Sequence, residues 1–302
     1  MKISIIIPAK NEEKNVPILV DNIREAFKKL KHSYEIIFID DGSTDNTLGE
    51  MKKLKDSKIK IVSFRKNFGK SAALSVGFEK ATGDVIFTMD ADLQDDASEI
   101  PRFLEKLEEG YDVVSGWKFP RKDPFFKRFF SKIFNYMTSK VAGLRLHDYN
   151  CGFKAYKKDV LKDLQISGDL HRYIPALAHW KGYKVAEIKV THHPRVHGKT
   201  KYGAKRVFTG FLDLLTVAFM TKYAKKPMHF FGVIGIVLAF FGILISAYMA
   251  YLKFVFSVSI TERPLFMLGA VLIILAVQFI SIGLLGDMVT KKEDDYSVKE
   301  EI

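Results

Sequence analysis

Short apolar runs alternate with helical patterns over the first 115 residues of the chain. The apolar runs cover residues 3–7, 35–39, 59–64, 84–89 and 112–115, and each has the length of a buried strand. Apolar residues recur at helical spacing over residues 16–30, 44–54, 71–81 and 99–109, with turn residues at the junctions. This alternation predicts an α/β domain with a doubly wound sheet.

Two later segments, residues 230–252 and 264–286, are each 23 residues long and contain no charged side chain. At about 1.5 Å of rise per residue, each would span roughly 34 Å as a helix, which is enough to cross a bilayer core. Only residues 253–263 separate them, so we expect a hairpin of two transmembrane helices. A buried helix pair in a soluble protein is the alternative.

The positive charges that flank these segments predict their orientation. Basic residues lie before the first segment and after the second, whereas the loop between them has only two: Lys222, Lys225 and Lys226; Lys291 and Lys292; Lys253 and Arg263. We therefore expect a two-span protein of the cell membrane with its N-terminal domain on the cytoplasmic side. No signal peptide is visible, and the single cysteine, Cys151, agrees with a reducing compartment.

Two further segments have one apolar and one basic face. Residues 124–141 predict an amphipathic helix in the plane of the membrane surface, with a helix packed on the sheet as the alternative, and residues 206–223 repeat the pattern. The expected organisation is a catalytic domain over residues 1–203, a juxtamembrane helix over 204–227, the hairpin over 228–289 and a charged cytoplasmic tail over 290–302.

The formal net charge is +12, and much of it lies within residues 118–145 and 188–206. Such basic segments indicate an anionic partner. The chain has no zinc-finger spacing, helix-turn-helix signature or RNP-like strand, so we expect lipid phosphate of the bilayer and no nucleic acid.

Four polar clusters follow predicted strands, at residues 8–12, 40–43, 65–70 and 90–95. In doubly wound sheets ligands bind beyond the carboxyl ends of the strands, so these clusters are expected to share one cleft. The last cluster reads Asp90-Ala91-Asp92-Leu93-Gln94-Asp95. Its oxygen ligands suit a hard divalent ion, whose remaining positions substrate phosphate would fill. No Gly-x-Gly-x-x-Gly follows the first strand and no Walker motif is present, which disfavours dinucleotide and P-loop chemistry.

The order and spacing of these motifs resemble family 2 glycosyltransferases of the GT-A fold. The resemblance is carried by PAKNEE at residues 8–13, DDGS at 40–43, NFGKSAA at 67–73 and DADLQ at 90–94. Downstream, DYNCGFK at 148–154, HRYIP at 171–175 and RVHGKTKYG at 195–203 look like the polyprenyl-phosphate branch. That branch includes dolichol-phosphate mannose synthases and bactoprenol glucosyltransferases.

The resemblance implies roles for individual residues. The nucleotide-sugar site would comprise Pro8, Ala9, Asn11, Glu12, Asp40, Asp41, Lys70, Asp90, Ala91, Asp92 and Gln94. Mg²⁺ or Mn²⁺ would be held by Asp90, Asp92 and Gln94, and the catalytic residues would be Asp92 and Asp148. The acceptor phosphate and the diphosphate would meet Lys118, Arg128, Lys132, Arg195, Lys199 and Lys201. Lys118 stands where the family has an arginine, and Arg121 is an alternative contact.

The implied activity is metal-dependent, inverting transfer of a hexose, glucose or mannose, from a UDP- or GDP-linked donor to a polyprenyl phosphate. The acceptor phosphate has a second pKa of about 6, so it is already a nucleophilic dianion at neutral pH and needs no strong base. The alternatives are a processive polysaccharide synthase, whose Gln-x-x-Arg-Trp motif is absent, and a membrane-tethered scaffold that binds a nucleotide sugar without turnover. The patterns leave open the sugar, the lipid length and whether the chain forms a homo-oligomer.

Overall fold

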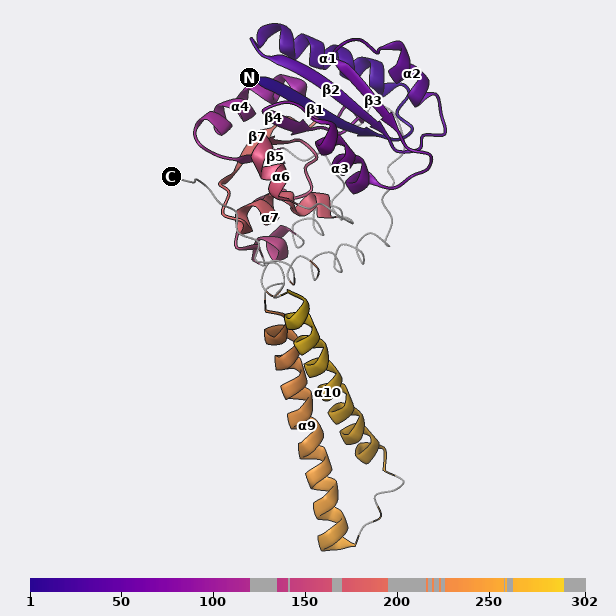
Figure 1. Ribbon diagram of the computed structural model, residues 1–302, viewed down its shortest axis with the longest axis vertical. Helices are drawn as coiled ribbons and strands as arrows, with labels where there is room; N and C mark the ends of the chain where they lie inside the picture. The colour runs from indigo at the N-terminus through magenta and orange to yellow at the C-terminus, as the bar shows by residue number, and fades with distance from the viewer. Residues whose placement is uncertain are drawn as a thin grey trace. The chain divides into compact units, whose positions relative to one another are not determined.

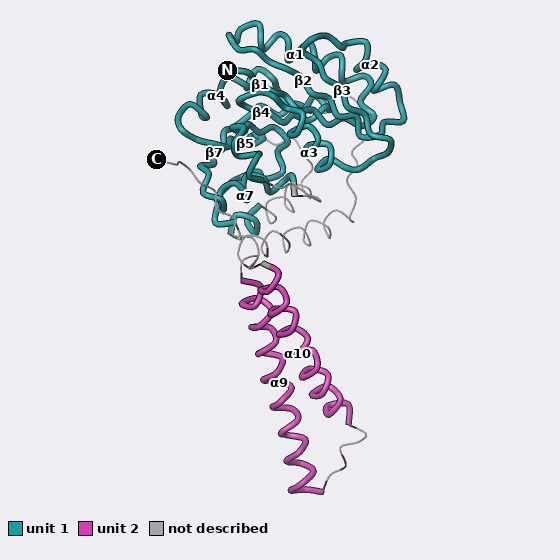
Figure 2. The backbone as a smooth tube through the Cα atoms, viewed as in Figure 1, with its two compact units in different colours: residues 1–217 teal, residues 218–302 magenta. Residues whose placement is uncertain are grey.

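The computed structural model describes residues 1–119, 135–140, 142–164, 170–194, 216, 219, 223, 226–257, 259 and 263–290. The chain divides into two compact units, residues 1–217 and 218–302 (Figure 2). The boundary expected at residues 203 and 204 lies outside the described residues, as do most of the two amphipathic segments and the tail.

A seven-stranded sheet forms the centre of the first unit, within the residues that the structure describes. Its strands are β1 (Lys2–Ala9), β2 (Ser33–Asp40), β3 (Ile59–Ser63), β4 (Val85–Thr88), β5 (Val113–Lys118), β6 (Lys154–Lys157) and β7 (Val185–Val190). Their order is β3-β2-β1-β4-β6-β5-β7, and β6 is antiparallel to both neighbours while the other pairs are parallel. The five predicted strands are present, and β6 and β7 are additions that the apolar runs did not indicate.

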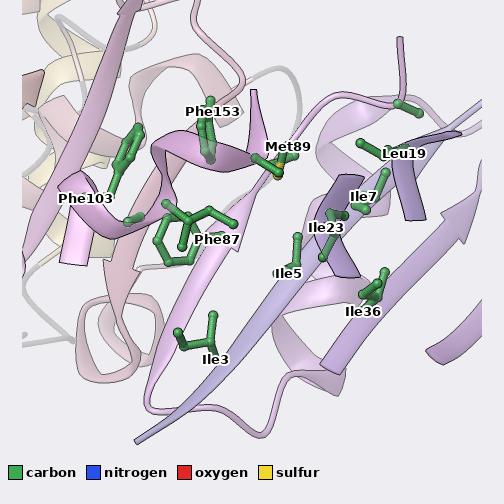
Figure 3. Close-up of a cluster of buried hydrophobic side chains, with 14 of the residues drawn as sticks. Ile3, Ile5, Ile7, Leu19, Ile23, Ile36, Phe87, Met89, Phe103 and Phe153 are labelled. Atoms are coloured by element: carbon green, nitrogen blue, oxygen red, sulfur yellow. The ribbon is translucent and has the colours of Figure 1, made fainter. Parts of the chain in front are cut away.

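Helices cover both sides of the sheet (Figure 1). They are α1 (Asn15–Lys29), α2 (Thr47–Lys53), α3 (Lys70–Lys80), α4 (Ile100–Glu108), α6 (Lys158–Asp163) and α7 (Ile174–Trp180). On one face, α1 and α4 share a hydrophobic core with alternate residues of β1, among them Ile3, Ile5 and Ile7 (Figure 3). On the other, α3 packs against Ile6 and Ile37. Because successive strand residues point to opposite faces, β1 is apolar on both sides, which confirms the doubly wound prediction.

The second unit contains two long apolar helices, α9 (Pro227–Phe256) and α10 (Pro264–Thr290). Their most apolar windows have mean hydropathies of 2.6 and 2.7, and only 17% and 11% of the residues in those windows are buried. A core helix of a soluble protein would bury its apolar side chains, so these exposed apolar surfaces favour membrane spans. The predicted hairpin is confirmed as two helices long and apolar enough to cross a bilayer.

Glycines bring α9 and α10 close together. A methyl group added at Gly242 would lie 2.8 Å from Ile273 Cγ1 and 3.0 Å from the carbonyl oxygen of Gly269. At one end of the hairpin, the Asp287 carboxylate accepts a hydrogen bond of 3.1 Å from the backbone N–H of Met228, in the first turn of α9. Small residues allow this close backbone approach where no hydrophobic effect drives helices together in lipid.

We expect Gly242→Ala to destabilise the hairpin by about 1–3 kcal/mol, because the added methyl overpacks the helix contact. Gly232→Ala is the matched control, since its methyl would meet only the flexible side chain of Met228. Unfolding of the full chain in detergent, followed by circular dichroism during an SDS titration, measures the difference. Equal stability of the two variants would contradict the close contact.

Candidate active site

The acidic motif begins at Asp90, directly beyond β4, and meets the first residue of α3. The Lys70 ammonium forms an ion pair with Asp90 Oδ1. Burial disfavours the charge on Asp90, but the nearby ammonium groups of Lys70 and Lys118 outweigh it and hold the pKa of Asp90 well below its ordinary value. Asp90 is therefore an anion at neutral pH, and two predicted donor-site residues, Lys70 and Asp90, lie together.

Gly152 lies directly against the Asp90 carboxylate. A Cβ atom at position 152 would be 2.5 Å from Asp90 Oδ2 and 2.6 Å from Oδ1. The antiparallel strand β6 produces this approach, because it pairs with β4 and its preceding residues return to the end of that strand. Any side chain at position 152 would displace the carboxylate, so Gly152 contributes to the site through the space it leaves.

Asp95 joins the acidic motif to Lys118. Its Oδ2 accepts a hydrogen bond of 3.1 Å from the Asp90 backbone N–H, and its Oδ1 lies 3.3 Å from Lys118 Nζ. Although burial disfavours the ammonium, the Asp95 carboxylate raises the pKa of Lys118 above its ordinary value. The structure thus pairs Lys118 with a carboxylate of the acidic motif. The contact of Lys118 with an acceptor phosphate stays a prediction.

Asp92 and Gln94 complete the predicted metal ligands. Both lie on one tight turn, in which the Gln94 backbone N–H donates to Asp92 Oδ1 at 3.3 Å and Leu93 adopts a φ of 62°. This left-handed conformation is uncommon for a residue other than glycine, and it is found where the surroundings enforce it. Ala91, which lies between the two aspartates, is buried just beyond the end of β4.

The donor set fits a hard divalent ion whose shell is completed by other molecules. Two carboxylates and one amide supply oxygen, the ligand type that Mg²⁺ and Mn²⁺ prefer, and such sites usually add waters and phosphate oxygens. Within the described part of the chain, no group of three or more histidine, cysteine, aspartate or glutamate side chains could hold a metal by itself. A metal held by Asp90, Asp92 and Gln94 would keep coordination positions open for water and phosphate oxygens.

The predicted nucleoside residues lie at the carboxyl ends of β1 and β2. Asn11, with a φ of 57°, accepts a hydrogen bond of 2.8 Å from the Thr44 N–H and donates its own N–H to Ser43 Oγ at 3.0 Å. The Glu12 N–H donates to Thr47 Oγ1 at 2.8 Å. Pro8 and Ala9 end β1 beside these contacts. These hydrogen bonds connect the loop after β1 to the loop after β2 at one edge of the sheet.

Asp40 and Asp41 organise loops in this structure. Asp40 accepts hydrogen bonds from the Ser43 N–H at 3.0 Å and from Ser63 Oγ at 2.7 Å. Asp41 accepts from the backbone N–H groups of Phe68 and Gly69, at 2.7 and 3.0 Å. Each carboxylate thus holds a neighbouring loop in place, in addition to the nucleotide contact that the resemblance implies.

Asp148 is almost fully buried, at 1% exposure, and Glu187 of β7 holds its backbone. The Glu187 carboxylate accepts from the N–H groups of Asp148 and His147, both at 2.9 Å, and lies 2.7 Å from His147 Nδ1. The Asp148 carboxylate in turn accepts from the Asn150 N–H at 3.1 Å. Sequence reasoning missed Glu187, because a single acid in a mixed strand pattern gives no signal of its own.

The segment that precedes the basic loop is tied to the acidic motif. His192 forms a β-bridge with Asp95, and the His193 N–H donates to the Gln94 carbonyl oxygen at 3.1 Å. The chain therefore enters the predicted basic loop beside the proposed metal ligands. The predicted phosphate contacts of that loop and of the amphipathic helix lie outside the described residues: Arg121, Arg128, Lys132, Arg195, Lys199 and Lys201.

Two further cationic or polar side chains approach Asp90 without having been predicted as site residues. Lys154 is 3% exposed and donates to the carbonyl oxygens of Tyr149 and Cys151, and burial lowers its pKa. His171 Nδ1 lies 2.7 Å from Ser71 Oγ, and burial together with Lys70 lowers its pKa well below its ordinary value. Lys154 follows the residues Cys-Gly-Phe, and its position in the sequence gave no reason to assign it to the site.

Comparison with known proteins identifies the family of the chain. Residues 4–165 match the model of glycosyl transferase family 2. The chain is 38% identical to a dodecaprenyl-phosphate galacturonate synthase of Rhizobium johnstonii, over 96% of this chain and 88% of that protein. It is 33% identical to an undecaprenyl-phosphate 4-deoxy-4-formamido-L-arabinose transferase of Proteus mirabilis, over 97% of this chain and 90% of that protein.

Solved structures give the same fold. A glucosyl-3-phosphoglycerate synthase of Mycobacterium tuberculosis, solved with Mn²⁺, UDP and phosphoglyceric acid, superposes with a TM-score of 0.58 at 18% identity. The match covers 73% of this chain and 78% of that one. At this identity the likeness shows the fold alone, which is that of the GT-A enzymes. The family match and the two relatives establish that the chain is a glycosyltransferase and belongs to glycosyl transferase family 2.

Proposed function

We propose that the protein transfers a sugar from a nucleoside diphosphate donor to a polyprenyl phosphate at the cytoplasmic face of the cell membrane. The observation that carries this proposal is the pairing of Asp90 with Lys70 beside Asp92, at the carboxyl end of β4. Fixed positive and negative groups at this place suit a metal-bound diphosphate. Both relatives named above are polyprenyl-phosphate enzymes, which supports the acceptor class.

The donor half of the site would work through charge. A divalent ion held by Asp90, Asp92 and Gln94 would supply Lewis acidity that offsets the charge on the departing nucleoside diphosphate. Lys70 would contribute a second cation to the same diphosphate, since it already lies at Asp90. The loops fixed by Asn11 and Asp41 would border the nucleoside.

The acceptor half would work through positioning. The lipid phosphate is largely a dianion at neutral pH. Its oxygen would attack the anomeric carbon directly as the bond to the nucleoside diphosphate breaks, which inverts the configuration of that carbon. Asp148 would orient the acceptor phosphate or accept its residual proton. Bringing two anions together requires fixed cations, a role proposed for the six basic residues Lys118, Arg128, Lys132, Arg195, Lys199 and Lys201.

The expectation of glucose or mannose is revised. The two relatives are named for galacturonate and for 4-deoxy-4-formamido-L-arabinose. We propose a UDP-linked uronic acid of the galacturonate type as the donor, a choice supported by the 38% identity over 96% of the chain.

The proposal predicts formation of a lipid-linked monosaccharide. Purified full-length protein in detergent, with Mn²⁺, polyprenyl phosphate and radiolabelled UDP-galacturonate, UDP-glucose or GDP-mannose, should label the lipid most rapidly from UDP-galacturonate. Asp90→Asn with Asp92→Asn should lower the rate at least about 100-fold, because the metal's stabilisation of the leaving group is worth several kcal/mol. Absence of labelled lipid would indicate a scaffold, and labelled polymer a processive synthase.

Gly152→Ala should weaken binding of UDP with Mn²⁺ by about tenfold or more, because its methyl displaces the Asp90 carboxylate from the site. Isothermal titration calorimetry measures the affinity, and the melting temperature reports whether the variant remains folded. Gly232→Ala, in the membrane hairpin, is the control for an added methyl group. Unchanged affinity in folded Gly152→Ala would show that Asp90 takes no part in binding.

Glu187→Ala should lower kcat roughly 10- to 100-fold, because the backbone of Asp148 loses the carboxylate that holds it. The affinity for UDP with Mn²⁺ should stay within about twofold, since Glu187 contacts a different loop. In an Asp148→Asn background the same change should have little further effect on kcat. Additive losses in this double-mutant cycle would instead assign Glu187 a role independent of Asp148.

A further inference from the structure

Phe68 is an exposed aromatic side chain at the edge of the sheet where ligands bind. It lies in the segment between β3 and α3, and 57% of its surface is exposed. A single exposed aromatic residue is common on protein surfaces and needs no explanation by itself. What distinguishes Phe68 is the rigidity of the backbone that carries it and the identity of its neighbours.

Two backbone N–H groups fix the position of Phe68. Its own N–H and that of Gly69 donate to the buried Asp41 carboxylate, and the Gly69 N–H also donates to Asn67 Oδ1 at 3.0 Å. Gly69 has a φ of 93°, which favours glycine at this turn. These contacts involve only the backbone of Phe68, so they leave its ring available for a different purpose.

The neighbouring loop is pressed against this segment. A Cβ atom at Gly42 would lie 2.5 Å from the backbone carbonyl carbon of Lys66 and 2.7 Å from the Asn67 nitrogen. Gly42 also has a φ of 63°, so both the space and the conformation require glycine. The turn after β2 and the segment after β3 therefore form one closely packed edge, and Phe68 projects from an ordered backbone.

The ring has an aromatic neighbour and a cationic one. Phe64 makes an edge-to-face contact with it, with ring centroids 5.5 Å apart, and Lys66 Nζ lies 5.1 Å from its centroid. Two residues later, Lys70 reaches Asp90. The segment thus carries an exposed aromatic ring two residues before the lysine that meets the acidic motif.

We propose that Phe68 is the platform on which the donor's nucleobase stacks. This inference rests on the proposed function, because it concerns the donor site. Every nucleobase has a π face, and base–aromatic stacking is tolerant of base identity, so the platform would accept uracil or guanine alike. Selection between them would then fall to polar groups near Asp41, and Phe68 would supply affinity common to all nucleoside diphosphates.

Calorimetric titration of the full-length chain in detergent tests the platform with three probes, each with Mn²⁺: UDP, GDP and pyrophosphate. Phe68→Ala should weaken UDP and GDP about 5- to 150-fold, the range that corresponds to loss of one stacked base. Pyrophosphate, which has no base, should bind with unchanged affinity. Phe68→Trp should retain nucleotide binding, and Trp180→Ala, which removes an exposed aromatic ring at the end of α7, should change none of the three affinities.

Two outcomes would overturn the platform while leaving the proposed function intact: Phe68→Ala binds nucleotides as tightly as the parent, or it loses pyrophosphate and nucleotides by the same factor. A parent protein that binds none of the three probes would overturn the donor site of the proposed function and the platform together. Melting temperatures of the variants separate loss of binding from loss of fold.

Discussion

The charge on Asp90 is the constraint on which the site depends. A carboxylate at the end of a buried strand loses hydration, and this cost is tolerable only when cations or hydrogen-bond donors replace the water. Here Lys70 pairs with it, and Lys118 lies near enough to lower its pKa. Under the proposed function, this carboxylate would exchange its lysine partner for the metal ion when the metal-bound diphosphate binds.

The one antiparallel strand in the otherwise parallel sheet brings Gly152 to the Asp90 carboxylate. A parallel neighbour of β4 would start its next loop at the same edge and carry the chain away from Asp90. The antiparallel β6 instead enters from that edge, so that the residues before it, including Gly152 and Cys151, pass directly over the end of β4. Burial raises the pKa of the Cys151 thiol to about 12, so it stays protonated there and serves as a small apolar side chain.

Sequence patterns predicted the parts of the fold that are uniformly apolar, and failed where lysines interrupt the pattern. β1, β2 and β4 are buried on both faces and stand out as continuous apolar runs, whereas β6 reads Lys-Ala-Tyr-Lys and gives no such signal. The helix expected from residue 44 begins at Thr47, because Asp45 accepts the Thr47 N–H at 3.0 Å and holds a turn before it. Boundaries of this kind depend on individual side-chain contacts.

The candidate site shows the same division. The sequence predicted that Asp90, Asp92 and Gln94 would lie beyond the end of a strand, and they follow β4; their role as metal ligands stays a prediction from the resemblance. The sequence did not predict the partners of Lys118 and Asp148. Asp95 and Glu187 become neighbours of these residues only when β4, β5 and β7 are assembled, and that pairing joins residues about 20 to 70 positions apart. The composition showed an excess of positive charge. Which lysines are already paired with a carboxylate, as Lys70 and Lys118 are, could be learned only from the fold.

The membrane hairpin suits the physical nature of the proposed acceptor. A polyprenyl phosphate cannot leave the bilayer, so an enzyme that uses it gains by remaining there, where every encounter takes place within a thin layer of high effective concentration. An amphipathic helix alone binds a membrane reversibly, whereas two transmembrane helices anchor a chain effectively permanently. The close glycine contacts of α9 and α10 and the Asp287 hydrogen bond indicate that the hairpin is a packed structure in its own right. With the hairpin as the anchor, the catalytic unit would not need its own membrane affinity, and the basic residues proposed to bind the acceptor phosphate could serve that contact alone.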